Sequence, residues 1–208
     1  MHAFIDLFLH LDTHLQTIIA QYGTMTYAIL FLIIFCETGL VVTPFLPGDS
    51  LLFAAGTFAA LGSFNIALLF LLLAIAAILG NMLNYAAGKW LGEKVFTEHA
   101  HILKKSYLIK THAFYEKYGA KTIVISRFMP IVRTVAPFVA GAGTMRTSTF
   151  MFYNFIGGIL WVALFLFCGF FFGNIPSVKH NFSLVILVII GLSVLAPIIE
   201  WIRSRRHA

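Results

Sequence analysis

Three long runs of apolar residues constrain this chain more than any other feature. They cover residues 64–91, 149–172 and 182–199. A helix needs about 20 apolar residues to cross a hydrocarbon core about 30 Å thick, and these runs reach or nearly reach that length. The whole chain is 60% hydrophobic and 11% charged, whereas about 25% of the residues of a soluble domain are charged. The sequence therefore predicts an all-α integral membrane protein.

Two further apolar segments, residues 27–61 and 122–145, are interrupted by charged residues and by proline. Their pieces are too short to cross, since twelve helical residues cover only about 18 Å. Backbone that leaves the helix at membrane depth must be buried in protein or face a water-filled cavity. We therefore predict two re-entrant helical hairpins, with tips at residues 44–49 and 127–137. The residues expected to shape these tips by breaking helices or permitting a turn are Pro44, Pro47, Gly48, Pro130 and Pro137.

The distribution of lysine and arginine predicts the orientation in the membrane. Residues 92–121 and the C-terminal tail are rich in basic residues, whereas residues 173–181 contain only Lys179. By the positive-inside rule, the basic stretch and the C-terminus are cytoplasmic. Because residues 64–91 cross once between the two hairpins, we expect the hairpins to enter from opposite sides.

An internal repeat is consistent with this arrangement. A shift of 85 residues aligns Phe53 with Phe138 and Gly56 with Gly141; chance matches between small residues remain an alternative. We predict one membrane domain over residues 1–208, built around inverted repeats of a hairpin followed by a transmembrane helix, a construction found in many transporters. Its predicted parts are an N-terminal interfacial helix (1–21), repeat 1 (22–91), a cytoplasmic amphipathic linker (92–117), repeat 2 (118–174) and a C-terminal transmembrane helix (182–202).

Four ionisable residues lie inside the two hairpins: Glu37, Asp49, Arg127 and Arg133. A charge at the centre of a membrane helix costs roughly 2.5–3.5 kcal/mol on insertion scales, so such residues usually face a cavity or one another. One interpretation is purely structural, with acids and arginines paired to hold the broken helices together. The other is functional, because arginine suits bidentate phosphate binding and a carboxylate at low dielectric can take up and release a proton. Asn81 and Asn84 would either line the same cavity or form hydrogen bonds between helices.

Other classes of function find little support in the sequence. The sequence contains neither a grouped serine, histidine and acid nor a nucleotide-binding glycine loop, which are features that would indicate an enzyme. The histidines and the two cysteines lack the spacing of a metal site, and basic residues are not interleaved with aromatic ones on a soluble face as in nucleic-acid binding. We therefore expect no catalytic residue, no cofactor, no metal and no nucleic-acid partner. Self-association into a homo-oligomer stays open.

Two motifs resemble the bacterial DedA family, which is related to the SNARE-associated Golgi or VTT-domain proteins. They are Phe45-Leu46-Pro47-Gly48-Asp49 and the stretch from Arg127-Phe128-Met129-Pro130 through Arg133-Thr134 to Ala140-Gly141, together with Glu37-Thr38-Gly39 and Met145. The resemblance covers nearly the whole chain. It implies a multi-pass protein of the bacterial inner membrane with two re-entrant hairpins.

The resemblance also implies a function. Family members are similar to carriers of undecaprenyl phosphate, to factors that depend on the proton motive force, and to phospholipid scramblases. Their essential acids fall on Glu37 and Asp49, and their essential arginines on Arg127 and Arg133. This chain departs from the family at Gly80-Asn81, where close relatives tend to have an acid. We expect a lipid flippase or scramblase whose partners are a lipid head group and protons. The alternatives are a proton-coupled antiporter of small cations or drugs, and a membrane-homeostasis factor without a transported substrate.

Overall fold

The computed structural model describes residues 17, 19, 21–40, 48–92, 105–143, 145–173 and 175. The regular structure of these residues is helical throughout, and none of them forms a strand. The predicted interfacial helix, the tip residues Pro44 and Pro47, and the predicted transmembrane helix at 182–202 lie outside the described residues, apart from a few positions at the end of the first.

Two helices of the described chain are long enough to cross a membrane. They are α5 (Ile66–Leu91) and α9 (Thr147–Phe172), each of 26 residues and each about 39 Å long at 1.5 Å per residue. The exposed face of α5 is apolar along its length, at Leu68, Leu71, Ile75, Leu79 and Leu83. A surface helix of a soluble protein carries polar residues on that face. A helix that faces lipid needs apolar side chains on its exposed face as well as on the face that packs against the protein.

The remaining helices are shorter than a membrane span. Two of them flank the first predicted tip, α3 (Met25–Gly39) and α4 (Gly48–Ala60). The others lie between α5 and α9 in the chain: α6 (Lys105–Tyr118), the 3-10 turn η2 (Gly119–Lys121), α7 (Thr122–Ile125), a second 3-10 turn η3 (Ser126–Phe128) and α8 (Pro130–Ala142). The 13 residues of α4 and of α8 cover only about 20 Å.

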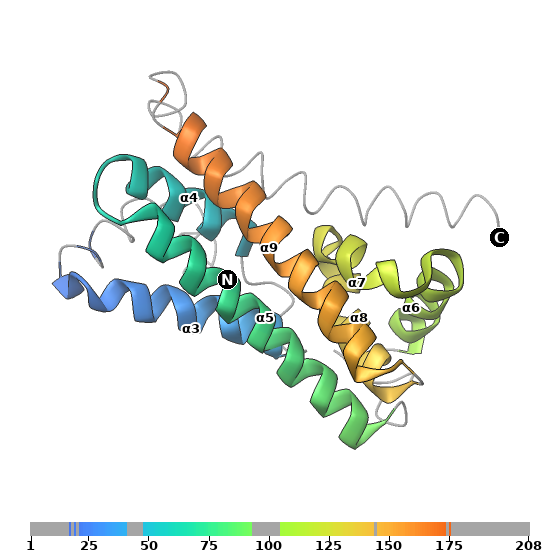
Figure 1. Ribbon diagram of the computed structural model, residues 1–208. Helices are drawn as coiled ribbons and strands as arrows, with labels where there is room; N and C mark the ends of the chain where they lie inside the picture. The colour runs from blue at the N-terminus through green and yellow to red at the C-terminus, as the bar shows by residue number, and fades with distance from the viewer. Residues whose placement is uncertain are drawn as a thin grey trace. The chain divides into compact units, whose positions relative to one another are not determined.

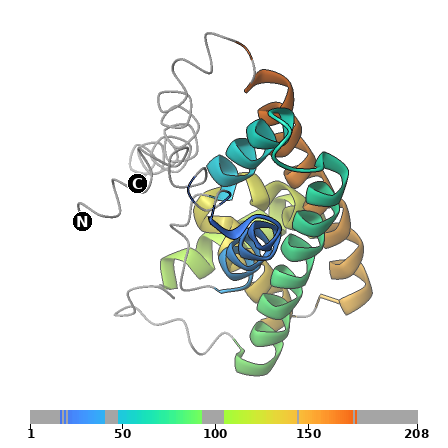
Figure 2. The same cartoon turned by 90° about the vertical axis from the view of Figure 1, so that its left-hand side faces the viewer.

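The helices contribute to two compact units that are interleaved along the chain. The first draws its described residues from Met1–Ile33, Pro47–Leu73 and Val162–Ala208, and the second from Ile34–Leu46 and Ala74–Trp161. In the first unit, α4 packs against the C-terminal part of α9, as both views show (Figure 1, Figure 2). A Cβ atom on Gly56 would lie 2.0 Å from the carbonyl oxygen of Leu166, so only glycine allows this approach.

The second unit uses the same kind of contact between α8 and α5. A Cβ atom on Gly141 would lie 2.0 Å from the carbonyl oxygen of Tyr85. Gly141 is the residue that the 85-residue shift aligns with Gly56. The short helix of each predicted repeat therefore packs against the long helix of the other, and in both cases a glycine permits the contact.

The break before α8 is narrower than the sequence indicated. The chain leaves the helical conformation at Met129 (φ −125°, ψ 105°), and α8 starts at Pro130. Proline is favoured at a first helical position because its missing N–H would have no partner there, and it forces the preceding residue into extended backbone. The expectation that Pro137 breaks a helix was wrong, because Pro137 lies inside α8. The buried side chains of Ala136 and Phe138 on either side of it supply packing that offsets the lost backbone hydrogen bond.

The start of α4 also differs from the expected boundary. Gly48 and Asp49 are the first two residues of this helix rather than part of the tip. The Asp49 carboxylate therefore lies in the first turn, where the partial positive charge of a helix N-terminus stabilises an acid.

Within the polar stretch before the predicted repeat 2, α6 packs against α8. The Tyr115 hydroxyl donates a hydrogen bond of 2.8 Å to the Ala136 carbonyl oxygen, and the Thr122 hydroxyl donates one of 3.0 Å to the Phe114 carbonyl oxygen. The opposite face of α6 exposes Ile109, Glu116 and Lys117. This helix thus joins the second unit through one of its faces.

Candidate functional site

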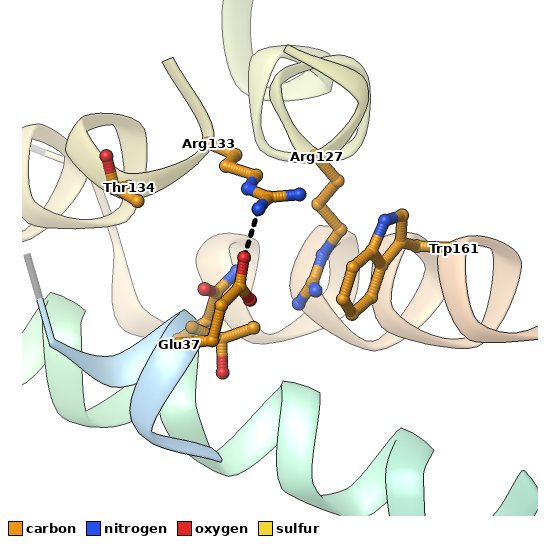
Figure 3. A pocket seen from close by; sticks show the side chains of 7 residues that line it. Glu37, Arg127, Arg133, Thr134 and Trp161 are labelled. Carbon is orange, nitrogen blue, oxygen red and sulfur yellow. Dashed lines mark ion pairs between the residues drawn. The ribbon is translucent and has the colours of Figure 1, made fainter. Parts of the chain in front are cut away.

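Glu37 is a buried acid near the end of an apolar helix. It lies in the last turn of α3, and its side chain is 1% exposed. A close backbone approach places this turn against α5, since a Cβ atom on Gly39 would lie 3.2 Å from the Cα atom of Gly80. The Glu37 carboxylate accepts an ion-pair contact from the guanidinium of Arg133 (Figure 3). A buried carboxylate requires such a partner, because an isolated charge in an apolar interior is strongly disfavoured.

Arg133 reaches Glu37 from the start of α8. Its side chain is 10% exposed, and its backbone N–H donates to the Met129 carbonyl oxygen at 2.8 Å, which anchors the first turn of the helix. The guanidinium carbon also lies 5.8 Å from the ring centroid of Trp161 on α9, within the range of a cation–π contact. Arg133 is therefore held by one charged partner and one aromatic partner.

Arg127 is the more deeply buried of the two arginines, with 3% of its surface exposed. It lies in η3, and its Nη2 donates to the Asn154 side-chain oxygen at 2.7 Å and to the Ala77 carbonyl oxygen at 3.3 Å. The Asn81 amide, oriented to satisfy its neighbours, accepts from the same nitrogen at 2.9 Å. Its Nε is buried and has no hydrogen-bond partner within the described part of the chain.

These side chains surround one cavity with about 250 Å³ of empty space, its open mouth included. Figure 3 shows Arg127 and Arg133 entering it from the same side, with Glu37 facing them from α3. The lining residues are Glu37, Thr38, Asn81, Arg127, Arg133, Thr134 and Trp161. Two guanidiniums and one carboxylate give this lining a net positive charge. Such a lining suits an anion.

The structure brings together three of the four ionisable residues identified in the sequence. Glu37, Arg127 and Arg133 come from three separate elements of the second unit and line the same cavity. Asp49 is buried in the first turn of α4, in the first unit. That it joins the other three stays a prediction.

The two asparagines of α5 have different surroundings. Asn81 lines the cavity. Asn84 is fully buried, and its amide donates to the Thr134 carbonyl oxygen at 2.8 Å and to the Thr38 carbonyl oxygen at 3.5 Å. Asn84 therefore links α5 to α3 and α8, which fits the packing interpretation better than the cavity-lining one.

Sequence reasoning overlooked Asn154 and Trp161 of α9. Both are buried, at 0% and 1% exposure, and each contacts one of the two arginines. A signal existed for Asn154, because no other carboxamide interrupts the apolar run of α9. Trp161 carried no such signal, since a tryptophan in an apolar helix is unremarkable without its neighbours.

Comparison with known proteins places this arrangement in a family. The family model described as the VTT domain matches residues 46–171. Protein DedA of Escherichia coli K12 is 55% identical over 207 residues, which cover 98% of this chain and 94% of DedA. The chain belongs to the DedA family of VTT-domain membrane proteins. No solved structure matches it.

More distant members extend the similarity. The inner membrane protein YqjA of E. coli K12 is 35% identical over 180 residues, covering 81% of each chain. An uncharacterised membrane protein of Mycobacterium tuberculosis H37Rv is 38% identical over 193 residues, covering 90% of this chain and 85% of the relative. The VTT match contains both arginines of the cavity, and Glu37 precedes it in the region shared with DedA.

Proposed function

We propose that this DedA-family protein is a lipid flippase or scramblase that moves a phosphate-bearing lipid, undecaprenyl phosphate or a phospholipid, across the cytoplasmic membrane. The observation that supports this most directly is the pair of buried guanidiniums that share one cavity with a single carboxylate. Arginine presents a planar fork that matches phosphate oxygens. A lipid needs only its head group to enter such a cavity, because its apolar chains can remain in the bilayer.

The membrane arrangement proposed with it has two re-entrant segments that contain α4 and α8. Their length supports this, since about 20 Å of helix cannot cross a core of about 30 Å. The equivalent glycine contacts of Gly56 and Gly141 support two repeats of one construction, which we propose to be inverted, with the C-terminus in the cytoplasm. The similarity to YqjA, an inner membrane protein, supports the same location here.

Proton coupling enters the proposal through the ion pair of Glu37 and Arg133. In this scheme the ionised carboxylate occupies Arg133, and protonation of Glu37 releases that guanidinium to the phosphate. The lipid phosphate and the proton therefore arrive together, and loss of the proton returns Arg133 to Glu37 and displaces the phosphate. Asp49 is proposed as a second proton acceptor, for which its burial in the first turn of α4 is the support.

Lipid transfer in proteoliposomes tests the proposal. Purified protein is reconstituted with undecaprenyl phosphate or with phosphatidylglycerol as the labelled lipid, with and without a pH gradient. We expect Arg127→Ala and Arg133→Ala to abolish transfer while the protein still inserts. Arg146→Ala is the matched control, because Arg146 is exposed and should leave transfer unchanged. Transfer at the wild-type rate by both cavity variants would contradict the proposal.

The antiporter alternative predicts a different result in the same vesicles. Small cations would drive proton flux in lipid that contains no phosphorylated isoprenoid. Two guanidiniums against one carboxylate repel cations, so we expect no such flux. The proposal therefore commits to an anionic substrate.

A further inference from the structure

The two arginines of the cavity are held by chemically different partners. Arg133 contacts a carboxylate, that of Glu37. The hydrogen-bond acceptors of Arg127 are two side-chain amides and a backbone carbonyl, all without formal charge. Among the described residues no carboxylate is in ion-pair contact with Arg127. Its charge is therefore buried without a carboxylate in contact with it, although Glu37 lines the same cavity.

Asn154 makes the shortest of these contacts and is itself firmly oriented. Its side chain is fully buried. Its amide nitrogen donates to the Ile78 carbonyl oxygen at 3.0 Å, so its oxygen must point the other way, toward Arg127 at 2.7 Å. The contact with Ile78 thus fixes which end of the amide faces the guanidinium.

The helix that carries Asn154 is also shaped around the arginine. One turn further along α9, a Cβ atom on Gly157 would lie 3.1 Å from Cδ of Arg127. Any larger residue at this position would press on the arginine side chain. Glycine at 157 and an amide at 154 therefore place Arg127 against α9, with its Nη2 occupied and its Nε without a partner in the described chain.

We infer that Asn154 is the positioning residue of the anion site: it fixes the guanidinium of Arg127 by a hydrogen bond while leaving its positive charge available to a phosphate. An aspartate there would provide the same acceptor geometry but would also neutralise the arginine and repel an anion. This role accounts for an amide at position 154 where a carboxylate would also fit. It rests on the proposed function, since it assigns a role within the same site.

Two substitutions of nearly equal size separate positioning from simple packing. Asn154→Asp retains the acceptor and adds a charge, whereas Asn154→Leu removes the hydrogen bond. Each is compared with wild type in the proteoliposome assay with undecaprenyl phosphate, and by thermal unfolding in detergent. Asn65→Asp is the control, because Asn65 is exposed, lies just before α5, and accepts hydrogen bonds through its side-chain oxygen, as an aspartate would.

For Asn154→Asp we expect thermal stability at or above the wild-type value and a transfer rate at least about tenfold lower, with a higher half-saturating lipid content. A residue that served only packing would not separate stability from transfer in this way. We expect Asn154→Leu to lose both, and Asn65→Asp to transfer as wild type does. Wild-type transfer by either variant of Asn154 would overturn the inference, and the leucine variant decides if the aspartate variant does not fold. Failure of the wild-type protein itself to transfer the lipid would instead overturn the proposed function.

Discussion

Replacing Glu37 with glutamine tests the ion pair that lines the cavity. The substitution preserves the shape of the side chain, so it removes a charge without creating a hole. The two side chains of the pair are 1% and 10% exposed, which makes the pair a buried one. Removing one partner of a buried pair costs about 3–5 kcal/mol, because the remaining charge stays buried without compensation. The partial exposure of Arg133 favours the lower end, so we expect a loss of about 3 kcal/mol.

The free energy of unfolding, measured by denaturant titration in mixed micelles, gives the comparison. Glu116→Gln is the matched control: Glu116 is an exposed acid on α6, and its replacement should change stability by less than about 0.5 kcal/mol. A phosphate-bearing lipid should restore part of the loss, since a ligand at 100 times its dissociation constant stabilises by about 2.7 kcal/mol. Glu37→Gln should also remove any dependence of lipid binding on protonation at this site. If the glutamine variant is as stable as wild type, the ion pair does not stabilise the fold and the reasoning is refuted.

Four further substitutions test the contacts that hold the helices in place. Gly141→Ala and Gly56→Ala each place a methyl group 2.0 Å from a carbonyl oxygen, and each should cost at least about 1–3 kcal/mol by overpacking; a neutral effect of either on the unfolding free energy would contradict the close contacts. Asn65→Ala removes the side chain that accepts from two N–H groups in the first turn of α5 and should cost about 1 kcal/mol, detectable as a lower midpoint of thermal unfolding. Tyr115→Phe removes the hydrogen bond to Ala136 and should also cost about 1 kcal/mol. Because burial raises the pKa of Tyr115, its hydroxyl stays protonated in the folded state at pH values where the unfolded chain loses the proton. The difference should therefore be constant from neutral pH up to about pH 10, the ordinary tyrosine value, and decline above it; a difference that stays constant above pH 10 as well would show that burial does not raise this pKa.

Hydrophobicity and length were enough to predict the long helices. The expected run at residues 64–91 became Ile66–Leu91, and the run at 149–172 became Thr147–Phe172. Such boundaries depend on local chemistry, since apolar runs end where polar residues and caps begin. Asparagine, for example, is favoured just before the first turn of a helix, and Asn65 directly precedes α5.

The sequence located the break before α8 less well. The apolar pattern is interrupted by four residues that we interpreted as one long tip: Arg127, Pro130, Arg133 and Pro137. Only Pro130 begins a helix, and Pro137 lies within one. Proline lacks the same N–H in both places, but whether a helix survives that loss depends on packing from α5 and α6, which no local pattern contains.

The charged residues themselves were determined by the sequence, because four ionisable side chains in apolar segments are conspicuous and need an explanation. Which partner each would have was decided only by tertiary structure. Glu37 pairs with Arg133, which is 96 positions away in the chain, and Arg127 takes an amide of α9 instead of an acid. Hydrogen bonds and ion pairs depend on distances of a few ångströms between elements, and packing contacts such as those of Gly39 and Gly141 set those distances in the second unit. The sequence by itself thus identifies the charges within the apolar segments, and the packing of backbones against one another decides which side chains they contact.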